Sequence, residues 1–166
     1  MFNLETHSTG SLEESYQELN AQLAALLSGE RDFICNAAQF SAFVMQTVTD
    51  LNWSGFYFSR GEELVLGPYV GKVACTRILF GRGVCGKAAI TLQTQRIEDV
   101  HAFDGHIACD AASASEVVIP VVVGGKLMAV FDMDSPKVGR FSEIDQIGLE
   151  SFVATFIEAT DFSWSI

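Results

Sequence analysis

Ser115–Asp134 reads SEVVIPVVVGGKLMAVFDMD, and this stretch decides the fold. Residues 115–123 and 126–134 are rich in β-branched and apolar residues, which favour extended structure. Gly124 and Gly125 separate the two runs, and a glycine pair in this position is a strong signal for a two-residue hairpin turn. The sequence therefore predicts an antiparallel hairpin over this stretch.

A second hairpin is predicted upstream of the first. Trp53–Phe58 is aromatic and favours a strand, and the turn Arg60–Glu63 leads from it into Leu64–Leu66. Arg96 and Ile97 add a brief strand between the two hairpins. Because hairpins supply the strands, we expect an antiparallel sheet.

Helices flank these hairpins in the sequence. Ser11 and Glu14 have capping-box spacing, and apolar residues recur every three or four positions from there to near Gly29. Ser142 can cap a last helix with an apolar face, and a short helix is predicted over residues 87–92.

A second long helix is predicted over residues 32–51. Its apolar stripe includes Ile34, Ala38 and Val44, and Cys35 broadens that stripe. We therefore expect Cys35 to be a packing residue.

Together these elements predict an α+β fold, an antiparallel sheet with helices packed mainly on one face. The chain has 166 residues, 49% of them hydrophobic, which is enough for one core without disulfides or a metal. We expect a single domain over residues 1–166, with its core at about residues 11–160.

Charge and hydropathy exclude several classes of partner. The net charge of −11 repels nucleic acid unless a local basic patch overrides the field. No apolar run reaches the roughly 18 residues of a membrane span, and the longest, Val117–Val123, is broken by Pro120. The N-terminus lacks the features of a signal peptide, so a reducing, cytoplasmic location is expected.

The cysteines are Cys35, Cys75, Cys85 and Cys109. No C-x-x-C pair is present, so we expect no zinc site. In a reduced domain a cysteine is more often a small buried hydrophobe than a reactive group. However, Cys75 lies near Arg77 and Cys85 near Arg82, and a neighbouring cation favours the thiolate.

Cys109 has a different context. It lies in the polar stretch 99–115, which has no periodicity and is predicted to be a long, accessible loop. His101 and His106 could lower its pKa, although loop histidines are more often satisfied hydrogen-bonding groups. Cys109 is thus a candidate nucleophile, beside Cys75 and Cys85.

Gly81–Gly86 reads GRGVCG and matches the dinucleotide fingerprint G-x-G-x-x-G. A dinucleotide-binding domain needs repeated βαβ units with parallel strands, whereas this chain is built from hairpins. The glycines more plausibly allow tight turns around Cys85.

Acidic residues at the end of the central hairpin form a second candidate site. Asp132 and Asp134 share one face of their strand because side chains alternate along it. Two carboxyl groups in a pocket raise one pKa, and a protonated carboxyl can donate to an oxygen. The alternative is a solvated strand end. Glu116 joins them only if a bulge or bend, near Pro120, interrupts the strict hairpin register.

Trp53 and Tyr57 are four residues apart on a predicted strand, so they share a face. They could form an aromatic wall of a site, although core packing is the commoner use of such residues.

Taken together, these motifs resemble those of the free methionine-R-sulfoxide reductase family, whose fold is a GAF domain. Four groups of segments, spanning roughly residues 11–157, carry the match: NWSGFY (52–57); GKVACTRI (71–78) with GRGVCG (81–86); DVHAF (99–103) with GHIACDAAS (105–113); and SE (115–116) with DMDS (132–135). Two positions depart from the family pattern, where Leu79 and Asp104 replace expected prolines.

The resemblance implies that Cys109 attacks the sulfoxide sulfur, that Cys75 resolves the sulfenic acid and that Cys85 is an auxiliary thiol. It also implies a substrate site lined by Trp53, Tyr57, Glu116, Asp132 and Asp134. The implied reaction is the reduction of free L-methionine-(R)-sulfoxide, with thioredoxin as external reductant and no bound cofactor.

Two other readings of the chain stay open. It could be a non-catalytic GAF module that binds a small ligand, or a redox sensor that uses the same cysteines. The sequence also leaves open whether Cys75 or Cys85 resolves, which carboxyl is the general acid, and whether the protein forms a homodimer.

Overall fold

The computed structural model describes residues 10–102 and 112–163. In chain order the elements are α1 (Leu12–Leu27), α2 (Phe33–Thr47), β1 (Trp53–Arg60), β2 (Glu63–Gly71), β3 (Arg77–Leu79), α3 (Gly83–Thr91), β4 (Gln95–Ile97), the 3₁₀ turn η1 (Val100–Ala102), β5 (Ser115–Val123), β6 (Lys126–Ser135) and α4 (Glu143–Ala159).

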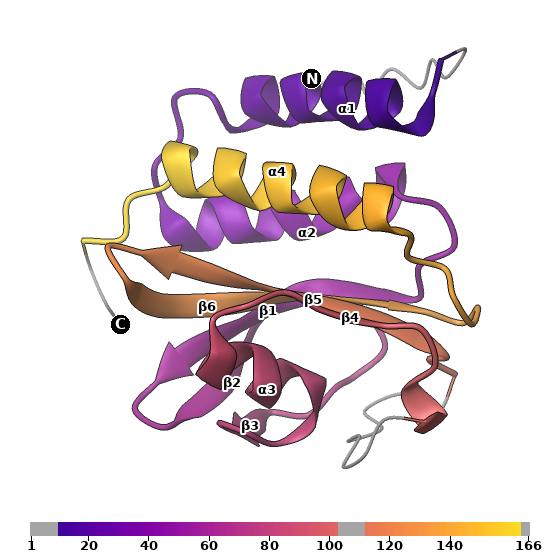
Figure 1. Ribbon diagram of the computed structural model, residues 1–166. Helices are drawn as coiled ribbons and strands as arrows, with labels where there is room; N and C mark the ends of the chain where they lie inside the picture. Colours follow the sequence, from indigo (N-terminus) through magenta and orange to yellow (C-terminus); the bar gives the residue numbers. More distant parts are fainter. Residues whose placement is uncertain (1–9, 103–111, 164–166) are drawn as a thin grey trace.

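The strands form one sheet in the order β3-β2-β1-β6-β5-β4, and every neighbouring pair is antiparallel. Figure 1 shows α1, α2 and α4 on one side of this sheet and only α3 and η1 on the other. The predicted α+β class, the antiparallel sheet and the one-sided helix layer are therefore confirmed. Both predicted hairpins are present, as β1–β2 and β5–β6.

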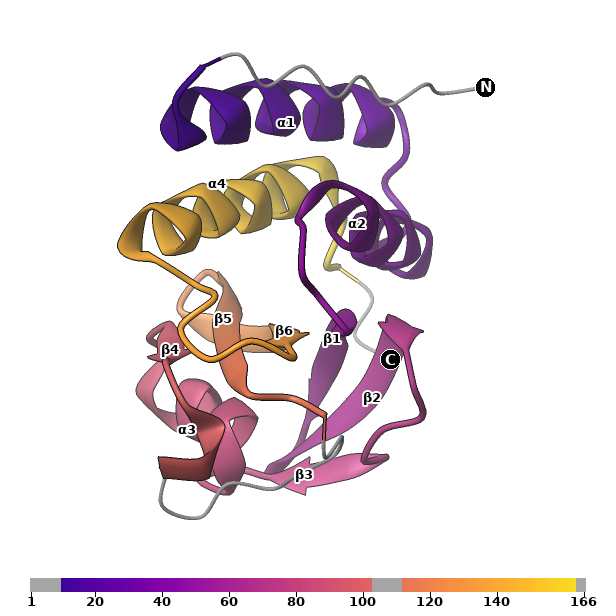
Figure 2. The same ribbon diagram turned by 90° about the vertical axis from the view of Figure 1, so that its right-hand side faces the viewer.

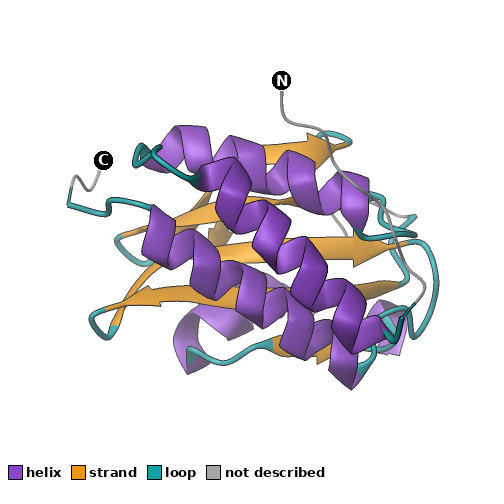
Figure 3. Cartoon of the chain, turned by 90° about the horizontal axis from the view of Figure 1, so that it is seen from above, coloured by secondary structure: helices purple, strands orange, loops and turns teal. Residues whose placement is uncertain are grey.

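The helix layer is packed around phenylalanine rings. α2 and α4 lie directly on the sheet and α1 lies over α4, as Figures 1 and 3 show. Phe40 of α2 contacts Phe56 of β1, Phe131 of β6 and Phe156 of α4, with ring centroids 4.6 to 5.5 Å apart. These four side chains are at most 1% exposed, so they form the centre of the core.

A buried polar network joins α1 to the start of α4. The Tyr16 hydroxyl donates to Asp145 Oδ1 at 2.7 Å, and Arg140 Nη1 donates to the same oxygen at 3.0 Å. Ser142 caps α4 and its hydroxyl donates to Asp145 Oδ2 at 2.6 Å. Gly148 leaves room for the Tyr16 ring, since a Cβ at that position would collide with it.

The second helix differs from the prediction in length and orientation. It ends at Thr47, before the left-handed residue Asp50 (φ 63°), instead of continuing to residue 51. Ile34, Cys35 and Ala38 are exposed, so the expectation that Cys35 is a packing residue is wrong. The buried face is set instead by large aromatic side chains such as Phe40, which remove more apolar area from water than Cys or Ala can.

The other face of the sheet is covered by α3 and β3, which lie together in Figures 1 and 2. α3 begins at Gly83, four residues earlier than predicted, and so includes Cys85. A Cβ at Gly86 would lie 2.6 Å from the Leu79 carbonyl oxygen, so glycine allows this close approach of helix and strand. Within the described ranges, no helix combines the length and apolar character that a membrane crossing requires.

Candidate active site

The candidate site lies on the sheet face opposite the helix layer, and the register of β5 and β6 determines which side chains reach it. The register shifts between Val121 and Val122, next to Pro120. This irregularity pairs Glu116 with Asp134 and Val118 with Asp132. Because directly paired residues point to the same side, Glu116 joins both aspartates, and the bulge that the sequence required is present.

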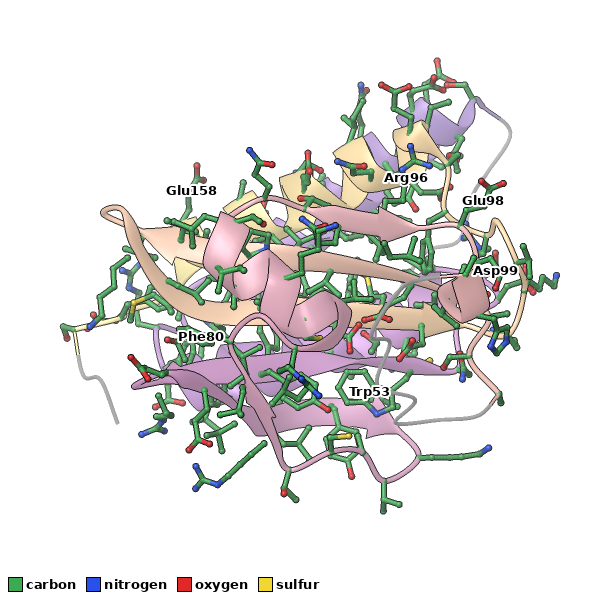
Figure 4. The ribbon with its side chains drawn as sticks, turned by 60° about the horizontal axis from the view of Figure 1, so that its bottom comes forward. Trp53, Phe80, Arg96, Glu98, Asp99 and Glu158 are labelled. Atoms are coloured by element: carbon green, nitrogen blue, oxygen red, sulfur yellow. The ribbon has the colours of Figure 1, made fainter. Side chains whose placement is uncertain are left out.

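An aromatic wall stands beside these carboxyl groups. Trp53 of β1 pairs with Asp134 of β6, and the Trp53 and Tyr57 rings stack with centroids 5.8 Å apart and planes 22° apart. Figure 4 looks toward this face and shows Trp53 projecting from it. Its indole Nε1 donates to the Lys72 carbonyl at 3.1 Å, which fixes the ring. The predicted pairing of Trp53 and Tyr57 on one face is confirmed.

Tyr69 extends the wall and was missed by the sequence analysis. Its ring stacks on Trp53 with centroids 5.2 Å apart, and it pairs with Gly55 across β1 and β2. A Cβ at Gly55 would lie 2.8 Å from the Trp53 ring and still closer to Tyr69. The glycine between Trp53 and Tyr57 was therefore the signal that a third ring fills the space above it.

Glu116, Asp132 and Cys85 form a buried cluster, each at most 7% exposed. Cys85 Sγ lies 4.0 Å from Glu116 Oε1. The sulfur of Cys85 and one carboxyl oxygen each of Glu116 and Asp132 all lie within 4.8 Å of one another. Asp132 Oδ1 is buried and has no hydrogen-bond partner among the described residues. Asp134 is half-buried at the edge of this cluster. One acceptor oxygen of the cluster is therefore left unused by the donors of the described residues.

Burial raises the pKa of both Glu116 and Asp132, and the negative charges of neighbouring carboxyl groups raise each pKa further. No cation in the described residues is among the groups that shift these two pKa values. The cluster therefore retains a proton where an exposed carboxyl would have lost it, and a carboxylic acid can donate to a substrate oxygen. A retained proton also competes with any metal cation for these oxygens.

Burial likewise raises the pKa of the Cys85 thiol, and the charges of Asp132 and Glu116 add to that effect. The expectation that nearby Arg82 favours a Cys85 thiolate is wrong, because Arg82 is exposed at the start of α3 while the sulfur faces carboxyl groups. Burial also raises the pKa of the Tyr57 hydroxyl. Both groups are thus neutral, protonated neighbours of the carboxyl cluster.

The remaining predicted thiols lie in the β2–β3 loop and beyond the described residues. Cys75 is half-buried in that loop and is disulfide-bonded, whereas Cys35 and Cys85 are free thiols. Cys109 and His106 fall outside the described residues. His101 is exposed in η1, where its backbone N–H donates to Asp99 Oδ1 at 3.0 Å.

The sheet order, the helix layer on one face and the site on the other define a GAF domain, and the GAF domain family matches residues 36–159. The free methionine-R-sulfoxide reductase of Escherichia coli (strain K12) is 52% identical over 141 residues, which cover 85% of this chain and 86% of that protein. The enzyme of the same name from Saccharomyces cerevisiae is 39% identical, covering 83% of this chain and 81% of that protein.

Among solved structures, the free methionine-R-sulfoxide reductase of Neisseria meningitidis in complex with its substrate has a TM-score of 0.90 and 35% identity. That match covers 96% of this chain and 95% of that one. The chain therefore belongs to the free methionine-R-sulfoxide reductase family, a family of oxidoreductases. The resemblance stated from the sequence is confirmed.

Proposed function

We propose that this protein reduces free L-methionine-(R)-sulfoxide to L-methionine by thiol chemistry. The observation that carries the proposal is the buried Glu116–Asp132 pair, which faces the Trp53–Tyr57 wall on the side of the sheet opposite the helix layer. Family membership supplies the substrate, because related enzymes bear that name and one was solved with its substrate bound.

In the proposed first step, the Cys109 thiolate attacks the sulfoxide sulfur while a protonated carboxyl of the cluster gives its proton to the oxygen. The attack forms a sulfur–sulfur bond, and the protonated oxygen becomes a hydroxyl. That hydroxyl then transfers to the Cys109 sulfur as the sulfur–oxygen and sulfur–sulfur bonds break and the electron pair of the latter returns to the methionine sulfur. Cys109 is left as a sulfenic acid, and methionine leaves. The raised pKa values of Glu116 and Asp132 support this role, since the proton donor must still carry its proton at neutral pH.

In the second step, the Cys75 thiol condenses with the sulfenic acid, which forms a disulfide and releases water. Two observations favour Cys75 over Cys85 as the resolving thiol. Cys75 is disulfide-bonded while Cys85 is a free thiol. Burial and nearby carboxyl groups also raise the pKa of Cys85, which leaves it a weak nucleophile.

The cycle closes when an external dithiol reduces the disulfide, and we assign this role to thioredoxin, with no cofactor bound to the chain. Turnover is then ping-pong, because methionine leaves before the reductant reacts. Such a cycle needs a pool of reduced dithiol protein, which places the enzyme in a reducing compartment such as the cytoplasm. We assign the whole cycle to one catalytic domain over residues 1–166.

Substrate recognition follows from the same face of the sheet. Asp134 at the cluster edge would bind the ammonium group of the free amino acid, a contact that is lost when the nitrogen is in a peptide bond. The Trp53 ring would receive the S-methyl group, and its π face suits the positive charge that builds on sulfur during attack.

The test measures methionine release with and without a reductant. Cys109→Ser should release no methionine even in a single turnover. Cys75→Ser should release one methionine per enzyme but should not consume NADPH with thioredoxin and its reductase. Cys35→Ser is the matched control and should cycle normally, because Cys35 is an exposed free thiol on α2.

Three results would contradict the proposal. Methionine release by Cys109→Ser would show that another group is the nucleophile. Normal cycling by Cys75→Ser would move the resolving role to Cys85. A wild-type protein that releases no methionine with any dithiol would leave only a non-catalytic GAF module.

A further inference from the structure

Basic residues are concentrated in one segment of this acidic chain. Residues 64–97 contain no Asp or Glu and five basic side chains, which are Lys72, Arg77, Arg82, Lys87 and Arg96. The segment has a formal charge of +5, against −16 for the rest of the chain and −11 for the whole. A negatively charged partner is therefore repelled by most of the protein and attracted to this segment.

The basic segment covers one side of the molecule. It runs from β2 through β3 and α3 to β4, and α3 and β3 lie beneath the sheet in Figures 1 and 2, away from the helix layer. All five basic side chains are exposed. Arg77 also pairs with Glu63 at the neighbouring strand end, so its charge is partly compensated. Arg96 is the exception to this one-sided placement, because it donates to Gln146 of α4 and to the Phe141 carbonyl on the helix side. The other four lie on the β2–β3 loop, β3 and α3, on the same side of the sheet as the candidate site.

The disulfide-bonded Cys75 lies inside this segment, in the β2–β3 loop. Val73, two residues before it, is 85% exposed, and Val70 is 37% exposed. Lys72, between the two valines, and Arg77, two residues after Cys75, are exposed as well. An apolar spot with a charged rim next to a reducible sulfur has the composition of a protein-docking surface.

We propose that the β2–β3 loop, residues 70–77, is the docking surface for an acidic dithiol protein that reduces the enzyme by attacking Cys75 Sγ. This inference rests on the proposed function, because it names the surface and the sulfur used in the recycling step. The exposed valines supply apolar contact, and the basic segment steers a negatively charged partner toward them.

The exchange balances in two steps. A thiolate of the partner attacks Cys75 Sγ, the disulfide breaks, and the other cysteine of that disulfide leaves as a thiolate. The mixed disulfide joins the first cysteine of the partner to Cys75. The second thiol of the partner then attacks the sulfur of that first cysteine and releases Cys75 as a thiol. The partner ends as an intramolecular disulfide, and the enzyme has gained two electrons and two protons.

The experiment measures disulfide reduction without any sulfoxide, so its outcome is independent of the substrate assignment. Oxidised enzyme is mixed with reduced thioredoxin of acidic surface, and the second-order rate is followed by stopped-flow tryptophan fluorescence. Val73→Asp should lower this rate by about tenfold and Lys87→Glu by about threefold, with the wild-type rate falling as salt is added.

Two variants provide matched controls. Val138→Asp places the same change on a side chain that is 60% exposed in the β6–α4 loop, and Lys126→Glu reverses an exposed charge at the β5–β6 turn. Both should keep the wild-type rate. Dithiothreitol, a small neutral dithiol, should reduce all five proteins equally fast, because it needs no docking surface.

Mapping the mixed disulfide completes the test. A thioredoxin that lacks its second active-site cysteine should be trapped on Cys75. Trapping on another cysteine would overturn the proposal, as would a Val73→Asp variant that reacts with thioredoxin at the wild-type rate. Slow reduction of Val73→Asp by dithiothreitol would overturn it too, because the substitution would then have changed the reactivity of the disulfide and not the docking of the partner. Failure of sulfoxide turnover in wild-type enzyme would refute the proposed function alone.

Discussion

The two faces of the sheet bury side chains of different character. The face under the helices is filled by phenylalanine rings such as Phe40 and Phe131. The opposite face buries Glu116, Asp132 and Cys85 beside Trp53 and Tyr57. The first face supplies stability through apolar burial, and the second gives up part of that stability because it buries titratable groups.

Two buried aspartates, Asp145 and Asp132, show that the environment can shift the pKa of the same side chain in opposite directions. Asp145 accepts hydrogen bonds from Tyr16, Arg140 and Ser142, and these donors hold its pKa below the ordinary value despite burial. Asp132 faces other carboxyl groups, and its pKa is raised. Asp145 is therefore a permanent structural anion, whereas Asp132 belongs to a cluster that can keep and give a proton.

The largest expected effect is on the helix face. Phe40→Ala should lower the free energy of unfolding by about 4 kcal/mol, because it leaves a cavity among three rings. Denaturant unfolding measures the change, with Ile147→Ala as control, since Ile147 is 62% exposed and its loss should cost less than about 0.5 kcal/mol. A loss below about 1 kcal/mol for Phe40→Ala would show that this face is not the stabilising one.

The second effect separates the two aspartates. Asp132→Asn should lower kcat/KM for free methionine sulfoxide by roughly 100-fold, or about 3 kcal/mol, while the protein stays folded. Asp145→Asn should instead lower the free energy of unfolding by about 2 kcal/mol and leave kcat/KM of the folded protein unchanged. Unchanged kinetics in Asp132→Asn would show that this buried carboxyl takes no part in the reaction.

The third effect is the dependence of stability on pH. Glu116 and Asp132 have raised pKa values, so the folded state holds more protons than the unfolded state once the pH exceeds about 4. The contribution of these two groups to the free energy of unfolding is fully present below their pKa values in the unfolded chain. It is lost as pH rises through their raised pKa values in the folded protein, by up to about 1.4 kcal/mol per pH unit for each retained proton.

Asp145 contributes with the opposite sign, because its stabilisation is present above its unfolded pKa and is lost as pH falls through the lowered folded value. Unfolding measured across the range from about pH 4 to 8 should therefore show a smaller decline with pH in Glu116→Gln than in wild type. Identical slopes would mean that Glu116 is ionised in the folded protein.

The smallest effect concerns a single hydrogen bond in the helix layer. Tyr16→Phe keeps the ring that packs on Phe152 but removes the donor to Asp145. Because Arg140 and Ser142 remain as donors, the free energy of unfolding should fall by only about 1 kcal/mol. Thermal unfolding measures the change, and a loss as large as that of Asp145→Asn would show that Tyr16 is the main partner of the carboxylate.

The central hairpin and several side chains of the site face could be predicted from the sequence. Gly124 and Gly125 located the central hairpin, and the period of two placed Asp132 with Asp134 and Trp53 with Tyr57. The bulge that brings Glu116 to the same face could be stated only as a condition, because one residue of register is not encoded in periodicity. The burial of Cys85 and the exposure of Cys35 depend on how their helices rotate against the sheet, which tertiary packing decides.

A titration of the carboxyl cluster tests the central claim most directly. With Glu and Asp side-chain carboxyl carbons labelled with ¹³C, the chemical shifts of Glu116 and Asp132 can be followed by NMR as pH is raised, with Asp145 as internal comparison. We expect at least one proton to remain on the Glu116–Asp132 pair at neutral pH, while Asp145 is fully ionised. Complete ionisation of both cluster residues near pH 4, as for ordinary surface carboxyl groups, would contradict the account.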